Sequence, residues 1–305
     1  MDYKIIAVTP AGRKQYLELL KQYVLNDGCI AEWQLWDNCR TDADREYINI
    51  LASQHPKIKI IRTEGTAGIN RDVNKFYRYC NDTDAFYLKI DDDVVYIKDG
   101  CARKMLEKAV ATKDRCIWWS PLVINNAVSS WLLKYHTAND IPQTLTCQAG
   151  DQNGWKNPEF AAFIHTMALD AIRKNEPGKF SMPDFEISLS RFSINFYCFF
   201  GETVRKLGEA FCPPDVDDEE WLSAVLPSRE GKKGLIVGSE FVVHFAFHTQ
   251  ERHLLEQNIL AQYYELAGLE YKREKKSLVK KEPAQKKRTL SRLRKIYKAL
   301  IKSLS

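Results

Sequence analysis

Long hydrophobic runs are missing from this 305-residue sequence. No window approaches the roughly 18 to 20 apolar residues that cross a bilayer. The first residues also lack the basic start and apolar stretch of a secretory signal peptide. We therefore expect a protein that is made and kept in the cytoplasm.

Cysteine pairs at redox or metal-binding spacing are also absent. The eight cysteines are scattered, without a C-x-x-C or a zinc-ligand pattern, so we interpret them as reduced thiols without a catalytic role. Cys116 and Cys198 sit in apolar runs and are expected to fill the core. Neither a Walker loop nor a G-x-G-x-x-G motif occurs, which argues against ordinary nucleoside triphosphatases and dinucleotide oxidoreductases.

Apolar runs alternate with helical periodicity through the first 120 residues. Hydrophobic residues make up 45% of the chain, which is enough for a sizeable core. The alternation predicts an α/β fold, with a mostly parallel sheet and helices on both faces. The expected strands are 3–9, 32–36, 57–62, 85–90 and 115–119, and the expected helices are 13–25, 42–53, 71–80 and 99–112.

The alternation stops after residue 120. Residues 120–185 are rich in Asn, Trp, Pro and Gly and predict irregular structure that forms part of a site. Strands are expected again at 193–200 and 240–247, and helices at 202–207 and 250–267.

Three consecutive aspartates, Asp91, Asp92 and Asp93, follow the expected strand 85–90. Clustered carboxylates repel one another unless a cation neutralises them, and Mg²⁺ and Mn²⁺ prefer such oxygen ligands. In an extended strand Asp91 and Asp93 would share one face and Asp92 would take the other. The pattern indicates a D-x-D site for a metal that binds a diphosphate; the alternative is a solvated acidic turn.

Polar residues also follow the other expected strands, at the edge where open α/β sheets bind ligands. They offer flexible backbone, an acid for ribose or base contacts and an arginine for phosphate, which suits a nucleotide diphosphate. These groups are Thr9, Pro10 and Arg13, then Asp37 and Asn38, and then residues 64–71.

With these elements in this order, residues 1–255 resemble the GT-A-fold glycosyltransferases, especially bacterial enzymes that build surface polysaccharides. The segments that carry the resemblance are IIAVTPAGR, LWDN, EGTAGINRD, KIDDDVVYI, DDEEWLS and HFAFHTQ. The opening differs from the V-I-I-P-x-Y-N pattern of the largest GT-A family. The resemblance implies that Asp37 touches the uracil or ribose, that Arg71 neighbours the nucleotide, and that Asp93 ligates Mn²⁺ or Mg²⁺ together with Asp91. A turn-capping acid and a solvated arginine are the alternatives for Asp37 and Arg71.

An acidic cluster, Asp217 to Glu220, precedes an amphipathic turn. Inverting transfer needs a general base for the acceptor hydroxyl, and the resemblance implies that this cluster supplies it. Glu219 is the first choice and Asp218 the second. The alternative is that the acids only stabilise the first turn of a helix through its dipole.

His244 and His248 are expected on one strand, on the same face. The resemblance makes His244 the preferred additional metal ligand, followed by His248; a hydrogen-bonded core histidine is equally compatible. Trp131, Trp155 and His165 fall where the resemblance implies an acceptor site, although a tryptophan in an apolar context usually belongs to the core. Residues 125–126 and 193–195 are plausible hydroxyl readers.

The C-terminal tail is strongly basic. Residues 271–305 hold 14 lysines and arginines and two acids, whereas the first 270 residues hold 31 basic and 38 acidic residues. Apolar residues recur at helical spacing from Leu290 to Leu304, which predicts an amphipathic helix, within 285–305, on an anionic membrane surface. A nucleic-acid-binding arm and a partner-docking helix are the alternatives, and we consider nucleic acid unfavoured.

Together these patterns predict a GT-A domain over 1–255, a closing helix over 256–270 and the basic tail over 271–305. The predicted function is metal-dependent, inverting transfer of a hexose from a nucleotide sugar, UDP favoured, to a lipid-linked or growing surface glycan. The enzyme would lie peripherally on the inner face of the cell membrane. The alternatives are a sugar nucleotidyltransferase and a non-catalytic glycan- or membrane-binding protein on a decayed transferase fold.

Overall fold

In the computed structural model, residues 3–66, 68–188 and 190–272 are described. The predicted basic tail helix lies outside these residues. Residues up to Tyr271 form one compact unit. The strands are β1 (Lys4–Ala11), β2 (Ile30–Asp37), β3 (Ile58–Ile61), β4 (Ala85–Ile90), β5 (Val94–Ile97), β6 (Cys116–Ile124), β7 (Phe185–Ile187), β8 (Phe196–Phe200) and β9 (Lys233–His244).

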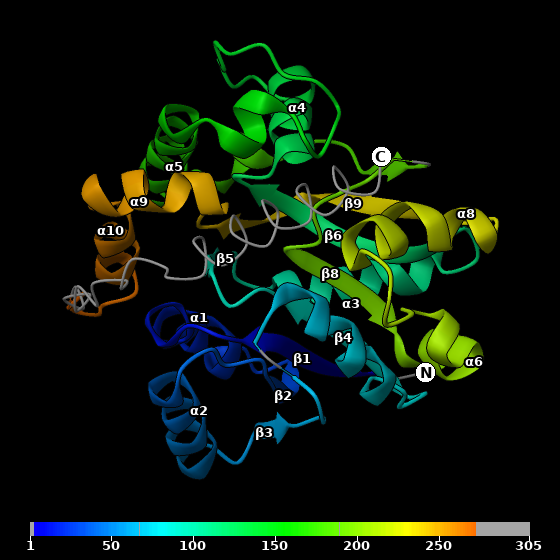
Figure 1. Ribbon diagram of the computed structural model, residues 1–305. Coiled ribbons are helices and arrows are strands. Elements are labelled where there is room, and N and C mark those ends of the chain that lie inside the picture. The colour runs from blue at the N-terminus through cyan, green and yellow to red at the C-terminus, as the bar shows by residue number, and fades with distance from the viewer. Residues whose placement is uncertain (1–2, 67, 189, 273–305) are drawn as a thin grey trace, which may run out of the picture. The chain divides into compact units, whose positions relative to one another are not determined.

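The α-helices follow the same order along the chain (Figure 1). They are α1 (Lys14–Asn26), α2 (Asp42–Gln54), α3 (Cys101–Thr112), α4 (Ala127–His136), α5 (Pro158–Arg173), α6 (Gly201–Leu207), α7 (Asp218–Glu220), α8 (Leu226–Arg229), α9 (His248–Glu256) and α10 (Ile259–Leu266). The tighter or wider turns are η1 (Asn70–Tyr79), η2 (Gln152–Lys156), η3 (Pro177–Phe180), η4 (Gly208–Ala210) and η5 (Trp221–Val225).

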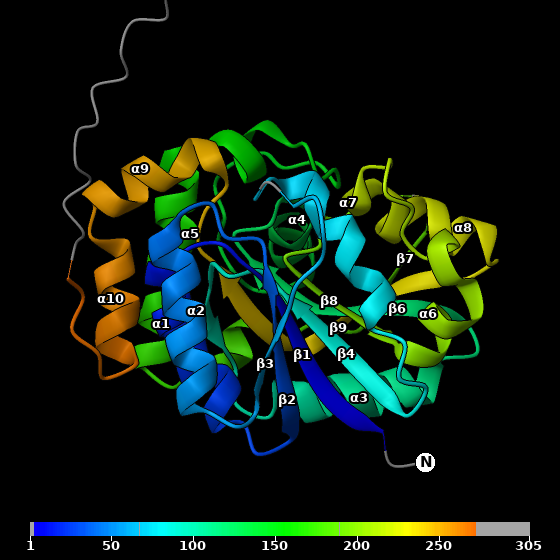
Figure 2. The ribbon, with the colours of Figure 1, turned by 60° about the horizontal axis from the view of Figure 1, so that its bottom comes forward.

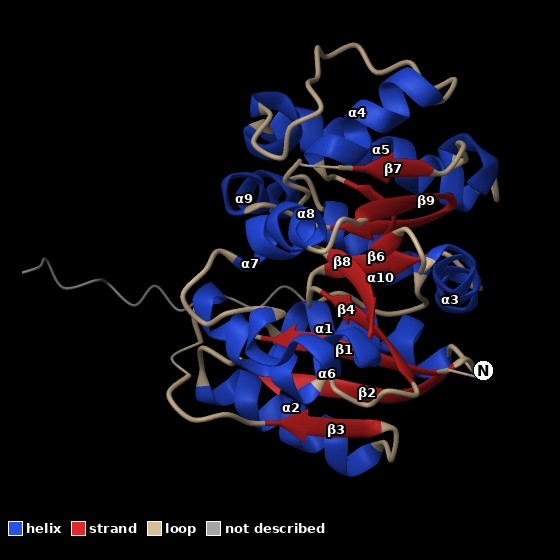
Figure 3. Ribbon diagram, turned by 90° about the vertical axis from the view of Figure 1, so that its right-hand side faces the viewer, coloured by secondary structure: helices blue, strands red, loops and turns tan. Residues whose placement is uncertain are grey.

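The nine strands of the described residues form one sheet in the order β3-β2-β1-β4-β8-β6-β9-β5, and β7 also pairs with β9. Figure 3 shows the strands stacked in this order from β3 to β9. Strands β1, β2, β3 and β4 are mutually parallel, β8 runs against both β4 and β6, and β6 is parallel to β9. The carboxyl ends of β1, β2, β3, β4, β6 and β9 therefore lie at one edge.

Helices cover both faces of the sheet. Figure 2 shows α1, α2, α5, α9 and α10 on one side of the strands and α6 and α8 on the other. The predicted α/β fold is confirmed, with β5, β7 and β8 as antiparallel additions. Within the described part of the chain, no helix has the length and hydrophobicity needed to cross a membrane.

The prediction of irregular structure over 120–185 is wrong for two helices, α4 and α5. Asn126 caps α4 by accepting a hydrogen bond from the Ser129 amide, and Asn157 caps α5 with Pro158 as its first residue. Asparagine before a helix and proline at its first position are helix-start signals. The asparagines and prolines that suggested loops are therefore the capping residues of helices.

The core is rich in aromatic side chains. Trp118 is fully buried and stacks against both Phe192 and Tyr197, with ring centroids 5.5 and 5.6 Å away. Cys116 and Cys198 are buried as predicted, and all eight cysteines are free.

The packing of Trp118 leads to a stability prediction. A Cβ atom at Gly234 would lie 2.0 Å from the Trp118 ring, which is fully buried and packs against Phe192 and Tyr197. We expect Gly234→Ala to lower the free energy of unfolding by about 1–3 kcal/mol through overpacking. Gly28→Ala, whose Cβ would meet nothing within 4 Å, is the control. Equal denaturant midpoints for the two variants would contradict the prediction.

Candidate active site

The polar residues of interest gather at the edge where six strands end. Arg13 follows β1, Asp37 ends β2, and the three aspartates follow β4. The asparagines 125 and 126 follow β6, His244 ends β9, and Asn195 directly precedes the antiparallel strand β8 at the same edge. The topology thus brings together groups that are up to about 230 residues apart in the sequence, as expected for an open α/β sheet.

The three aspartates form a turn between β4 and β5 instead of continuing the strand. The Val94 amide donates to the Asp91 carbonyl at 3.1 Å, which closes the turn. The expected alternation, with Asp91 and Asp93 on one face, is therefore wrong. In the structure Asp92 and Asp93 share one cation, whereas Asp91 pairs with another.

Arg13 is the cation that Asp92 and Asp93 share. One guanidinium nitrogen of Arg13 lies 2.5 Å from Asp92 Oδ1 and 3.0 Å from Asp93 Oδ2, and the Gly12 amide donates to Asp92 Oδ2 at 3.1 Å. Burial raises the pKa of Asp92, although the Arg13 charge opposes this effect. The guanidinium also lies over the ring of Tyr16, 4.7 Å from its centroid. Arg13 thus keeps two buried carboxylates side by side.

His244 completes the group around Asp93. Its Nε2 lies 3.5 Å from Asp93 Oδ2, and its Nδ1 lies 3.2 Å from the carbonyl oxygen of Asn125. Because a carbonyl only accepts hydrogen bonds, Nδ1 carries a proton and Nε2 is the nitrogen that faces the carboxylate. Asn125 adopts the left-handed backbone region (φ 61°), and its side chain donates to the Phe245 carbonyl at 2.8 Å, which fixes this carbonyl–histidine contact.

The predicted shared face of His244 and His248 is wrong. Strand β9 ends at His244, and His248 is the first residue of α9, where it is exposed. The chain leaves the sheet between them because Phe247 forms the start of α9, with the Gln250 side chain accepting from its amide at 3.1 Å. His244 alone lies against an aspartate of the D-x-D segment.

The donors at Asp93 and His244 fit a divalent cation. A carboxylate oxygen and an imidazole nitrogen 3.5 Å apart are close to the ~3.0 Å that separates adjacent ligands of an octahedral ion. Within residues 3–66, 68–188 and 190–272, no three His, Cys, Asp or Glu side chains converge to hold a metal by themselves. Mg²⁺ commonly takes one or two protein carboxylates and completes its shell with substrate phosphates and water. Asp93 and His244 match such a partial shell.

Asp91 belongs to a second, adjoining network. Its Oδ1 lies 2.5 Å from Lys89 Nζ, and its Oδ2 accepts from Asn195 Nδ2 at 3.2 Å. Lys89 is buried, which lowers its pKa, but the nearby Asp91 and Asp218 carboxylates raise it overall. Asn195 in turn accepts from Asn126 Nδ2 at 3.1 Å. The sequence analysis gave Lys89 no role, although an isolated lysine in the apolar strand AFYLKI is a visible signal of a buried ion pair.

The acidic cluster adjoins this network, because Asp218 lies close enough to Lys89 and Asp91 to interact with both charges. Asp217 caps α7 by accepting from the Glu220 amide at 2.9 Å, and Glu219 pairs with Arg191 at 2.6 Å. Burial raises the pKa of Asp218, and the neighbouring Asp91 charge adds to that rise. Burial also raises the pKa of Glu219, and Arg191 opposes it. Arg191, which the sequence analysis missed, neutralises Glu219 but makes no ion pair with Asp218 in the described residues.

Asp37 is held at the end of β2 by two arginines. Arg62 Nε lies 3.0 Å from its Oδ2, and Arg45 Nε lies 3.4 Å from its Oδ1. Asp37 Oδ1 is buried and accepts no geometrically good hydrogen bond within the described chain. A cavity opens beside this group and is lined by Arg62, Thr63, Glu64, Lys75, Arg78 and Tyr79. The basic lining suits an anionic ligand.

Three other predicted nucleotide-binding residues have different surroundings. Thr9 is fully buried and accepts from Trp33 Nε1 at 3.0 Å, so it supports the sheet beneath the edge. Pro10 lies within β1, in register with Trp36 of β2, and is half-buried. Arg71 is exposed in the first turn of η1, without an ion pair to a described carboxylate.

The three candidate acceptor residues also differ from one another. His165 is fully buried, between the Tyr263 hydroxyl at 2.9 Å and the Phe245 carbonyl at 2.7 Å, and burial lowers its pKa to about 4. Trp131 is half-buried against Tyr135, with ring centroids 5.3 Å apart. Trp155 is exposed. Of the three, only Trp155 presents a large aromatic surface to a ligand.

The position of Arg13 leads to a second stability prediction. Arg13→Met would leave Asp92, which is 5% exposed, without its cation. Breaking a buried ion pair typically costs 3–5 kcal/mol, and we expect about 3 kcal/mol because the Arg13 side chain is 34% exposed. The measurement is urea unfolding. Lys14→Met is the control, because Lys14 is more exposed and makes only a long ion pair with Glu18, at 4.0 Å, and a contact with the Tyr47 ring at 5.5 Å among the described residues. A loss below about 1 kcal/mol would show that Asp92 does not depend on Arg13.

Comparisons with known proteins agree with this fold. The sequence model described as "Glycosyl transferase family 2" matches residues 15–173, more than half of the chain. A search of the curated proteins found no match. A mannosyltransferase from Pyrobaculum calidifontis, solved in complex with GDP-Man and Mn²⁺, is 14% identical with a TM-score of 0.51. The match covers 89% of this chain and 66% of that one.

Two solved 4-diphosphocytidyl-2C-methyl-D-erythritol synthases are also similar. The one from Anaerococcus prevotii is 12% identical, with a TM-score of 0.42, over 85% of this chain and 96% of that one. The other is 11% identical, with a TM-score of 0.43, over 84% of this chain and 99% of that one.

Proposed function

Because the chain belongs to glycosyl transferase family 2, we propose that it is a metal-dependent enzyme that transfers a hexose from a nucleotide sugar to a glycan hydroxyl. We propose a nucleoside diphosphate sugar as the donor, with UDP favoured from the sequence. The solved mannosyltransferase binds GDP-Man, so GDP sugars belong in any test. The acceptor would be a lipid-linked or growing surface glycan.

This proposal rests mainly on one observation: Asp93 and His244 lie next to each other at the carboxyl edge of the sheet. The acids Asp218 and Glu219, from a separate segment of the chain, lie near the same edge. Asp93 lies within the family match, and His244, Asp218 and Glu219 lie beyond it. Their convergence therefore comes from the fold and not from the matched segment alone. A diphosphate site needs cations, and Arg13 and Lys89 lie at the same edge.

Each group has a proposed task in the reaction. Asp37, whose buried Oδ1 lies 3.4 Å from Arg45 without a geometrically good hydrogen bond, would accept a hydrogen bond from the ribose or the base. When bound at Asp93 and His244, Mn²⁺ or Mg²⁺ would supply positive charge for the leaving diphosphate. Arg13 orients both Asp92 and Asp93.

The acceptor hydroxyl needs a base, and we now favour Asp218 over Glu219. As the acceptor oxygen forms its bond to the anomeric carbon, its proton would pass to the Asp218 carboxylate. The bond between that carbon and the diphosphate oxygen breaks, and its electron pair leaves with the diphosphate. Glu219 suits this task less well, because its carboxylate is paired with Arg191 at 2.6 Å. Attack from the side opposite the diphosphate makes the reaction inverting.

Ligand-dependent thermal stability tests the proposal directly. We expect UDP or GDP to raise the melting temperature in the presence of Mn²⁺ and much less in its absence, and CMP and ATP to have smaller effects. The preferred nucleotide then selects the nucleotide sugars whose slow hydrolysis is measured.

Two outcomes would overturn the proposal. No stabilisation by any nucleoside diphosphate would indicate a non-catalytic protein. Formation of a nucleotide sugar from a nucleoside triphosphate and a sugar phosphate, without hydrolysis of any nucleotide sugar, would indicate a nucleotidyltransferase.

We also propose that the basic tail places the enzyme on the inner face of the cell membrane. The tail falls almost wholly outside the described residues, so its sequence alone supports this: the apolar spacing from Leu290 to Leu304 and the excess of basic residues. Removal of residues 273–305 is expected to abolish co-sedimentation with anionic liposomes while the nucleotide-dependent stabilisation remains.

A matched variant separates the two contributions of the tail. Replacing Leu293, Ile296 and Leu300 with serine keeps every charge but removes the apolar face. We expect this variant to lose most liposome binding as well. If it binds as the full chain does, the contact is purely electrostatic. If the truncated chain still co-sediments, the tail is not the membrane contact.

A further inference from the structure

Asn74 is a buried residue whose side chain joins two distant segments of the chain. It lies in η1, the 3₁₀ helix that follows the segment 64–71, and it is 3% exposed. Its Nδ2 donates to the carbonyl oxygens of Pro213 and Val216, both at 2.9 Å. Val216 directly precedes the acidic cluster that contains Asp218, the proposed base.

The orientation of the Asn74 amide follows from its partners. A carbonyl only accepts hydrogen bonds, so the nitrogen of the amide, and not its oxygen, faces the two carbonyls. Both N–H groups are used, whereas Oδ1 is buried and accepts no hydrogen bond in the described part of the chain. A buried acceptor without a partner is unfavourable and needs an explanation. The two hydrogen bonds that the nitrogen makes supply one.

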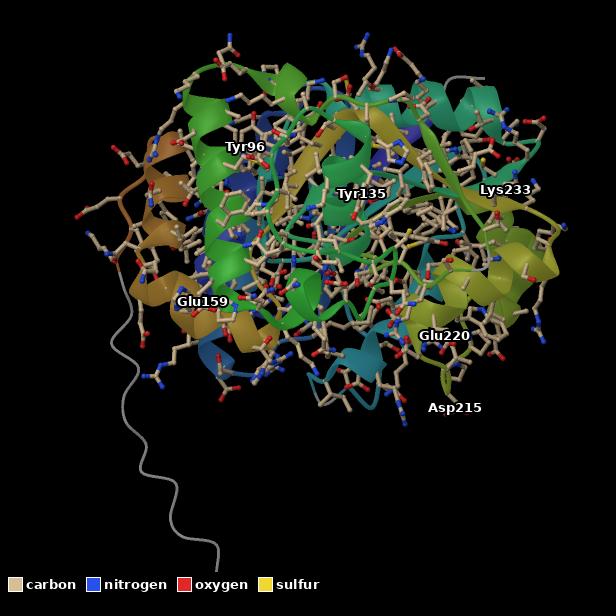
Figure 4. All side chains as sticks on the ribbon, turned by 90° about the horizontal axis from the view of Figure 1, so that it is seen from above. Tyr96, Tyr135, Glu159, Asp215, Glu220 and Lys233 are labelled. Carbon is tan, nitrogen blue, oxygen red and sulfur yellow. The ribbon has the colours of Figure 1, made fainter. Side chains whose placement is uncertain are left out.

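The residues that accept these hydrogen bonds form a turn over 213–216. Pro213 and Pro214 have no amide hydrogen to donate, and Pro214 and Asp215 are exposed. Figure 4 labels Asp215 in this turn. Within residues 3–66, 68–188 and 190–272, the two bonds from Asn74 are the only hydrogen bonds that reach the turn from another segment. The position of the turn therefore depends on Asn74.

Helix η1 gives Asn74 a firm support. Phe76 is fully buried and stacks on Trp36 of β2, with ring centroids 5.5 Å apart and planes 8° apart. In a 3₁₀ helix, side chains three residues apart share one face, so Tyr77 lies beside Asn74. The Tyr77 ring contacts Phe211, with centroids 5.9 Å apart. One face of η1 therefore holds the whole stretch that leads into α7.

The proposed base lies against the same face. Helix α7, which begins with Asp218, packs against η1. Burial raises the pKa of Tyr77, and the Asp218 charge adds most to that rise after burial. Asp218 also interacts with the charges of Lys89 and Asp91. A base that moves by about 1 Å can lose about 10²-fold in rate, so the support of α7 bears directly on the reaction.

We propose that Asn74 is a positioning residue for the proposed base: by holding the turn 213–216, it sets the distance between Asp218 and the acceptor hydroxyl. The inference rests on the proposed function and adds a residue that acts through Asp218 without touching a substrate. A purely structural residue affects stability whether or not Asp218 is present. A positioning residue affects kcat only while the Asp218 carboxylate is there to be positioned.

A double-mutant cycle on the full chain tests this inference. Asn74→Ala removes both donors, and Asn74→Leu removes them while keeping the branched shape of the side chain. The rate measured is hydrolysis of the nucleotide sugar that thermal stabilisation selects, in which water replaces the acceptor hydroxyl. We expect both variants to lower kcat by about 10- to 100-fold, with the donor KM and the Mn²⁺-dependent stabilisation by the nucleotide unchanged. In the Asp218→Asn background, the same substitutions should change kcat by less than about twofold.

Asn139→Ala is the matched control. The Asn139 amide also donates to a carbonyl of another segment, that of Lys179 at 2.6 Å, but neither segment carries a proposed site residue. This variant should leave kcat within about twofold of the unmodified chain.

Several results would overturn the inference. They are an unchanged kcat in both Asn74 variants, a rise in the donor KM that accounts for the loss, and an equal loss of kcat with and without the Asp218 carboxylate. Failure of both variants to fold would assign Asn74 to overall stability and would overturn it as well. If the unmodified chain hydrolyses a nucleotide sugar and Asp218→Asn does so equally fast, the inference is wrong and the proposed function stands. If the unmodified chain hydrolyses none, the proposed function is wrong, and the inference with it.

Discussion

Asp93→Asn is expected to lower the rate of sugar transfer by about 10³-fold, the equivalent of about 4 kcal/mol of lost charge stabilisation. Asparagine keeps the size of the side chain but removes the negative charge that faces His244 at 3.5 Å and Arg13 at 3.0 Å. Two measurements apply: transfer or donor hydrolysis, and the Mn²⁺-dependent thermal stabilisation by the nucleotide. We expect both to fall together, because one carboxylate serves both.

Asp99→Asn is the matched control, since Asp99 is exposed in the same segment and follows β5. It removes the same charge from the surface and should leave both measurements within about twofold, as is usual for surface substitutions. Retention of full metal-dependent turnover by Asp93→Asn would exclude Asp93 as a ligand. Loss of turnover with unchanged Mn²⁺-dependent stabilisation would give Asp93 another role.

The sequence analysis found most of this edge because ligand sites in α/β sheets follow the strand ends, and strand ends can be recognised from apolar runs. It placed Asp37 and Asp93 correctly at one edge, from segments about 55 residues apart, whereas His244 was named only from the resemblance and was expected inside a strand that ran on to residue 247. It failed on side-chain direction at the aspartates. Three polar residues after a strand can either extend the strand or form a turn, and the sequence does not distinguish the two. The hydrogen bond from the Val94 amide to the Asp91 carbonyl shows that they form a turn.

The cations that pair with the site carboxylates were not identified from the sequence, for a different reason. Lys89, Arg191 and Arg62 each neutralise a site carboxylate, at 2.5, 2.6 and 3.0 Å. Charged residues are abundant on any surface, and pairing depends on which loops the fold brings together. Lys89 was recognisable because it interrupts an apolar strand. Arg191 lies in a segment without periodicity and approaches Glu219 only through the tertiary structure.

The helices α4 and α5 were missed for a local reason. Their capping asparagines and the proline at the start of α5 suggested loops by composition, although the same residues begin helices when an amphipathic stretch follows. The turn η2, which carries Trp155, lies between these two helices.

Asp218→Asn is expected to lower kcat by about 10²- to 10⁴-fold, the usual contribution of a general base, with little change in nucleotide binding. Asp218 lies within the field of Asp91 and Lys89, and burial raises the pKa of its carboxyl above the ordinary value of 3.8. A base with a raised pKa holds its captured proton better. Glu219→Gln should have the smaller effect on kcat, because Arg191 already neutralises Glu219.

The pH profile gives an independent measure of the same assignment. Activity needs the ionised base, so kcat/KM should rise with pH through an apparent pKa above 3.8, and this acidic limb should disappear in Asp218→Asn. Asp215→Asn and Glu220→Gln are the controls: both side chains are exposed, and Figure 4 marks them in the same acidic stretch. If Glu219→Gln removes the limb and Asp218→Asn retains it, then Arg191 holds the true base in position, and Asp218 serves only to begin the helix.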